Sequence, residues 1–77
     1  MNYKNYKLER AKTIVRSYLM IEGDEMNLFH LKDEAYYISE TQGIEEQEAL
    51  RQLLGHYLSD KEEIEVLAEW IKENYEL

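Results

Sequence analysis

Regularly spaced carboxylates are the side chains of this sequence most suited to chemistry. Five glutamates recur at steps of three or four residues and form what we call the acidic ridge: Glu62, Glu65, Glu69, Glu73 and Glu76. On an α-helix they would share an arc of about 80°. Like charges four residues apart cost a helix about 0.2–0.5 kcal/mol per pair. Carboxylates on a rigid helix can nevertheless imitate a row of phosphates, and so dock on the basic surface of another protein.

Two apolar residues lie beside the acidic ridge on the same predicted helix. Val66 and Trp70 are four residues apart and widen the apolar arc of that helix. One interpretation places Trp70 in the core, because the helix fills a broad groove. The other makes Val66 and Trp70 an anchor for a partner or for a second copy of the chain, since Trp is enriched at binding hot spots. The predicted partner-binding residues are therefore the acidic ridge with Val66 and Trp70.

The sequence carries no pattern for catalysis, for a cofactor or for a metal. It has no Cys, and its two histidines, His30 and His56, are too far apart in sequence to show ligand spacing. It also lacks a glycine-rich phosphate loop, a recognisable Ser-His-Asp arrangement and a Glu-x-x-His pattern. A chain of 77 residues can hardly enclose a ligand pocket of ordinary size. We therefore expect a protein that is not an enzyme, with no catalytic, cofactor-binding or metal-binding residues.

Charge is unevenly distributed along the chain, whose net charge is −8. Residues 1–21 hold five basic residues and one acidic residue, whereas residues 22–77 hold four basic and sixteen acidic ones. Either the basic first segment lies against acidic helices, or two faces meet different partners. The basic segment also contains Tyr3, Tyr6 and Tyr18, a combination that could bind nucleic acid, although a solvated basic face is the preferred interpretation. Direct binding of nucleic acid is disfavoured, because the helix that would read the bases begins with glutamates that repel phosphate, Glu45, Glu46 and Glu48.

No segment of the sequence is suited to crossing a membrane. The first sixteen residues are charged throughout, and no apolar run approaches the roughly 20 residues that a membrane span needs. We therefore expect a cytoplasmic protein that does not contact a membrane.

Glycines divide the chain into pieces of helical length. Proline is absent, and the three glycines are Gly23, Gly43 and Gly55. The first piece, about residues 4–21, has apolar residues at helical spacing, and Gly23 could cap its C-terminus. In the last two pieces the inward stripes are Leu50, Leu53, Leu54, Tyr57 and Leu58, and then Ile64, Leu67, Ala68, Ile71 and Tyr75. Ser59 and Glu62 have the spacing of a capping box at the start of the fourth piece.

The second piece can be interpreted in two ways. Leu28, Leu31, Ala35 and Ile38 have helical spacing, with Asp24 or Asn27 available as an N-cap. The alternative is a β-hairpin at about residues 28–39, because this stretch is rich in aromatic and branched residues. Its turn has no Gly or Asn-Gly, so the helix is preferred.

The predicted fold is all-α, a single small helical domain over residues 1–77 built as a compact bundle of four short helices. The predicted function is that of a small acidic protein-binding module. It would inhibit or regulate a larger, nucleic-acid-handling protein by docking on a basic surface, as phage and mobile-element proteins do. One alternative is a small homo-oligomer with Trp70 in its interface, and another is a nucleic-acid binder that uses the basic first helix.

Overall fold

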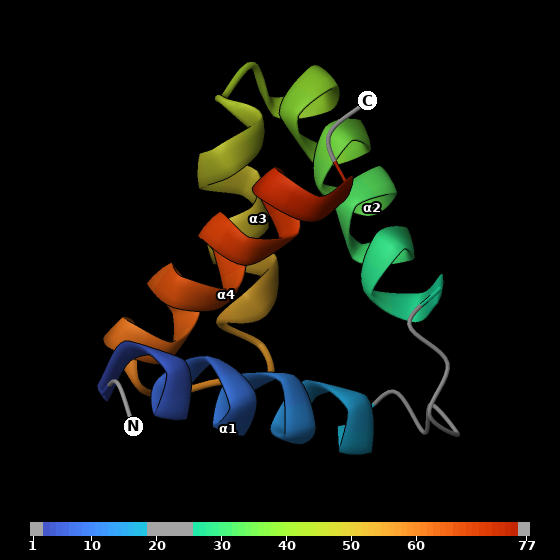
Figure 1. Cartoon of the computed structure of the whole chain (residues 1–77). Helices are drawn as coiled ribbons and strands as arrows, with labels where there is room; N and C mark the ends of the chain where they lie inside the picture. The colour runs from blue at the N-terminus through green and yellow to red at the C-terminus, as the bar shows by residue number, and fades with distance from the viewer. Residues whose placement is uncertain (1–2, 19–25, 76–77) are drawn as a thin grey trace.

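Four helices account for most of the chain. The computed structural model describes residues 3–18 and 26–75 (Figure 1). The helices are α1 (Tyr3–Tyr18), α2 (Met26–Gln42), α3 (Glu46–Leu54) and α4 (Lys61–Tyr75). The all-α prediction is confirmed. The hairpin alternative at about residues 28–39 is wrong, because α2 runs without a break through that range.

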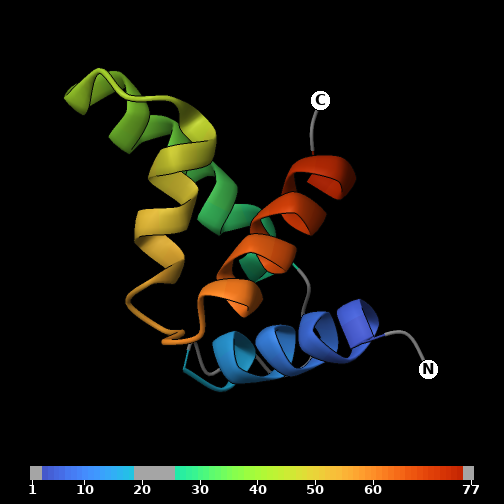
Figure 2. The ribbon, with the colours of Figure 1, turned by 90° about the vertical axis from the view of Figure 1, so that its left-hand side faces the viewer.

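Helix α4 is the central element of the arrangement, since it packs against each of the other three helices. Helices α2 and α3 run antiparallel as a helical hairpin, whereas α1 packs chiefly on α4. Figure 2 shows α1 crossing beneath the start of α4, with the tip of the α2–α3 hairpin projecting away from α1. The bundle is therefore closed by contact between the first and the fourth helix.

One apolar core joins all four helices. Its largest fully buried side chains are Val15 from α1, Leu54 from α3, and Leu67 and Ile71 from α4. The buried core as a whole consists of Ala11, Val15, Leu31, Ala35, Ala49, Leu50, Leu53, Leu54, Leu58, Leu67, Ala68 and Ile71. The stripes predicted for the third and fourth helices are thus largely confirmed. The side chains of Leu28 and Tyr75 lie outside the described part of the structure.

Two glycines lie at the ends of helices, and the backbone of one of them requires glycine. Gly43 follows α2 with φ of +68°, in the left-handed region that favours glycine. The N–H groups of Gly43 and Ile44 both donate to the carbonyl of Ser39, at 2.9 and 3.2 Å. Gly55 caps α3, so Tyr57 and Leu58 lie beyond the helix rather than on its stripe. Leu58 is still buried, because the turn after Gly55 returns it to the core.

The N-cap of α4 is Asp60 rather than Ser59, so the predicted capping box is wrong. Because α4 begins at Lys61, the Oδ1 atom of Asp60 accepts hydrogen bonds from the N–H groups of Glu62 at 2.8 Å and Glu63 at 3.4 Å. The other predicted caps fall at the start of α2 and the end of α1. Gly23 and Asp24 lie outside the described residues, and Asn27 lies inside α2 rather than before it.

The other carboxylate oxygen of Asp60 accepts a hydrogen bond from the Lys7 ammonium group of α1. This bond lowers the pKa of Asp60 below its ordinary value of 3.8, burial raises it in part, and the N–H groups of Glu62 and Glu63 lower it further. Ionised Asp60 therefore stabilises the folded state at all pH values above 3.8. That stabilisation is lost as the pH falls from this value through the lower pKa of the folded state.

We expect Asp60→Asn to lower the melting temperature by about 4 °C near neutral pH. Asparagine is as good an N-cap as aspartate, so the substitution removes chiefly the charge that faces Lys7. Thermal unfolding followed by circular dichroism checks the prediction, with Asp33→Asn on the exposed side of α2 as the control. The difference from wild type should shrink as the pH falls from 3.8 through the lower pKa of Asp60 in the folded state, because below both values Asp60 is protonated whether the chain is folded or unfolded. A difference that does not depend on pH would contradict this role of the charge.

Candidate functional site

The acidic ridge lies on the outer side of α4. The side chains of Glu62, Glu65, Glu69 and Glu73 are all exposed there, and Glu76 lies outside the described residues. The ridge is bounded on one side by α1 and on the other by α3, because α4 packs between these two helices. The structure therefore brings four of the five predicted glutamates onto one solvent-facing strip.

The side of the ridge next to α3 is partly neutralised. Arg51 of α3 places its Nε atom 2.8 Å from Oε1 of Glu65. Its Nη1 atom lies 3.3 Å from Oε2 of Glu48. The Nε–H group is not directed at the Glu65 oxygen, so this is a charge contact rather than a hydrogen bond. Among residues 3–18 and 26–75, the side chains of Glu62 and Glu73 have no ion-pair partner, so they contribute their full charge to the ridge.

Trp70 belongs to both the core and the surface. It is partly buried and packs against the core, which agrees in part with the core interpretation. Its ring also makes a cation–π contact with Lys12, whose Nζ atom lies 4.2 Å from the ring centroid. Lys12 is only 9% exposed, and its Nζ atom lies 3.5 Å from the carboxylate of Glu9. This cation–π contact joins α1 to α4 and leaves only part of the Trp70 side chain accessible.

A shallow groove of about 110 Å³ lies between α1 and α4 beside Trp70. The residues that line it are Asn5, Leu8, Val66, Glu69, Trp70 and Glu73. Both predicted apolar anchor residues thus line one hollow together with two members of the acidic ridge. Leu8 completes its apolar floor from α1, a contribution that reasoning from the α4 sequence alone missed.

Three cations of α1, Lys7, Arg10 and Lys12, contact α4 or the segment before it. Besides the Lys7–Asp60 pair, the Nε atom of Arg10 lies 3.2 Å from Oε2 of Glu63. Glu63 is only 4% exposed. Of the two interpretations of the uneven charge, the structure therefore supports the first, in which the basic helix lies against an acidic one. The sequence signal for Glu63 was its place outside the ridge, on the side of α4 toward Leu67.

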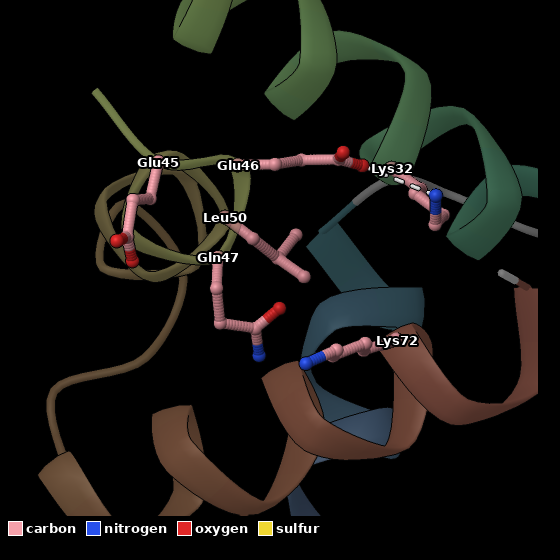
Figure 3. A pocket seen from close by; sticks show the side chains of 6 residues that line it. All are labelled: Lys32, Glu45, Glu46, Gln47, Leu50 and Lys72. Carbon is pink, nitrogen blue, oxygen red and sulfur yellow. Dashed lines mark hydrogen bonds and ion pairs between the residues drawn. The ribbon is translucent and has the colours of Figure 1, made fainter.

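A second hollow of about 210 Å³ lies between α2, α3 and α4. Figure 3 shows its lining residues, Lys32, Glu45, Glu46, Gln47, Leu50 and Lys72. Nζ of Lys32 pairs with Oε1 of Glu46 at 3.1 Å, and the side chains of Gln47 and Lys72 point toward one another. Because both signs of charge are present, the hollow presents no consistent electrostatic preference to a ligand.

Neither a metal site nor a membrane-spanning helix is found in the described part of the chain. No three His, Asp or Glu side chains there are grouped so that they could hold a metal ion. None of the four helices is both long enough and apolar enough to cross a membrane. When compared with known proteins, the chain matches no protein-family model, no curated protein and no solved structure.

Proposed function

We propose that the protein is a small acidic binding module that docks through its acidic ridge on a basic surface of a larger protein. The partner would be a protein that handles nucleic acid, because its phosphate-binding surface is the basic surface that a row of carboxylates complements best. Occupying that surface would inhibit or regulate the partner. Proteins of this kind are encoded by phages and mobile elements, an analogy that rests on small size and acidity.

The observation that carries the proposal is that three cations of α1 contact α4 or the segment before it. Lys7 and Arg10 pair with Asp60 and Glu63, and Lys12 lies on Trp70. These contacts engage the three cations at the α1–α4 junction, so Glu62 and Glu73 on the outer side of α4 keep their negative charge. Long-range attraction to a basic partner then increases the rate of association and falls with added salt.

The two alternative functions receive less support from the same contacts. For a homo-oligomer built on Trp70, Lys12 already covers the ring that the interface would bury. For a nucleic-acid binder built on α1, the side chains of Lys7 and Lys12 are only 17% and 11% exposed, and Arg10, which is 61% exposed, is paired with Glu63. Phosphate contacts need cations that reach solvent.

Charge reversal on the ridge tests the proposal. We expect Glu62→Lys with Glu73→Lys to fold normally and to weaken partner capture from a cell lysate at low salt by at least about tenfold. Asp33→Lys with Glu40→Lys is the matched control, since both residues are exposed on α2 and the change in net charge is the same. Captured proteins are identified by mass spectrometry.

The expected result has three parts. Wild type and the α2 control retain the same basic protein, high salt releases it, and nucleic acid competes with the wild-type chain for the purified partner. Equal capture by wild type, control and ridge variant would mean that the ridge does not bind. If nucleic acid does not compete with the chain for the purified partner, the proposed inhibition by occupying the nucleic-acid site is wrong.

A further inference from the structure

The geometry points to the groove between α1 and α4 as a receptor for one arginine side chain of the basic partner. This inference rests on the proposed function, since it names the group that the partner inserts beside the acidic ridge. It adds a specific anchor to what would otherwise be a general attraction between opposite charges.

The shape and floor of the groove suit one long side chain. Its volume of about 110 Å³ is well below the several hundred cubic ångströms of pockets that hold small-molecule ligands. Leu8 and Val66 are partly buried, and with Trp70 they form an apolar floor. The methylene stem of an arginine would cover this floor, while its charged end remained at the edge.

The rim of the groove suits a guanidinium group. Glu69 and Glu73 are four residues apart on α4, both are exposed, and both line the hollow. Side chains four residues apart on a helix are neighbours, so the two carboxylates can accept hydrogen bonds from one planar donor. Arginine is favoured over lysine because its five donors are fixed in a plane and its charge is more weakly hydrated.

A cation of the protein already contacts Trp70, although Lys12 is not among the residues that line the groove. The Lys12 ammonium group lies over the ring, 4.2 Å from its centroid. The incoming guanidinium therefore binds at the carboxylate side of the groove, where Glu69 and Glu73 offset the repulsion from Lys12. Trp70 lines the path of the stem and so reports on occupancy.

The fluorescence of Trp70 gives a direct test, because it is the only tryptophan in the chain. The probe is a short peptide of alternating glycine and arginine, added to the full-length protein. We expect a saturable change in Trp70 emission with this peptide. A lysine peptide of equal length should bind at least about threefold more weakly, and a citrulline peptide, which is neutral and nearly isosteric, should cause no change.

A variant that fills the groove separates this site from general attraction. Asn5 lines the groove and is exposed, so Asn5→Arg should place a guanidinium of the protein itself at the rim. We expect it to weaken binding of the arginine peptide at least about fivefold. The control is Gln42→Arg, which makes the same change in charge on the exposed end of α2 and should weaken binding less than about twofold.

The outcomes distinguish the groove from the ridge. The groove is wrong if the arginine peptide binds, as measured with a fluorescent label, while Trp70 emission stays constant. It is also wrong if Asn5→Arg and Gln42→Arg weaken binding equally, or if no arginine peptide binds. In each of these cases the ridge is still judged separately by capture with Glu62→Lys and Glu73→Lys, because that measurement does not depend on Trp70.

Discussion

Leu67→Ala is expected to lower the free energy of unfolding by about 2–5 kcal/mol. The Leu67 side chain is fully buried on α4, the helix that packs against all the others, so its removal leaves a cavity at the junction of the bundle. A folded chain of 77 residues has a total stability of about 4–12 kcal/mol. Urea denaturation followed by circular dichroism should therefore show a much lower midpoint and, at the upper end of the range, partial unfolding without urea.

The matched control for Leu67→Ala is Leu8→Ala, which removes the same atoms from a side chain that is only partly buried. We expect a markedly smaller loss, because water already reaches part of Leu8 and the groove can relax around the gap. Equal losses for the two variants would contradict the placement of Leu67 at the centre of the core.

Glu63→Lys is expected to lower the free energy of unfolding by about 3 kcal/mol. The substitution puts a second cation beside Arg10, at a site on α4 that is nearly closed to solvent. Since Arg10 itself is 61% exposed, water screens part of the repulsion. The same urea measurement checks the prediction.

Exchanging the two charges tests whether the Arg10–Glu63 contact is the cause. The double variant with Arg10→Glu and Glu63→Lys restores opposite charges, so we expect it to recover at least about half of the stability that Glu63→Lys loses. If the double variant is as unstable as Glu63→Lys alone, the loss of stability comes from the fit of the side chain at position 63 and not from the Arg10–Glu63 ion pair.

The elements that depend on local periodicity could be predicted from the sequence. The core stripe of α4 and the break at Gly43 follow from residue spacing and backbone preference, whereas the predicted stripe of the third helix ran past Gly55, where α3 in fact ends. The helical choice for α2 also followed from spacing, because no residue in the stretch suited the turn of a hairpin.

The features that depend on contacts between distant segments could not be predicted. Ser59 and Asp60 are both good N-cap residues, so the sequence alone does not decide between them. In the structure Asp60 caps α4, and it also pairs with Lys7, fifty-three positions away in the chain. Likewise, the sequence places Glu63 outside the acidic ridge, but its burial beside Arg10 depends on the packing of α1 against α4. The candidate site also combines features that local periodicity predicts with features that depend on distant contacts. Periodicity alone placed the acidic ridge on one side of α4, whereas the Arg51–Glu65 pair and the Lys12–Trp70 contact needed the packing of three helices.

The packing of α1 on α4 sets the order in which a newly synthesised chain can fold. Helix α1 leaves the ribosome first, yet the surface that buries Ala11 and Val15 is completed only when α4 has been made. The α2–α3 hairpin is local in sequence and can form while synthesis continues, since short loops close quickly. During this interval the apolar side of α1 is exposed, which makes the nascent chain most vulnerable to aggregation and to proteases just before α4 appears.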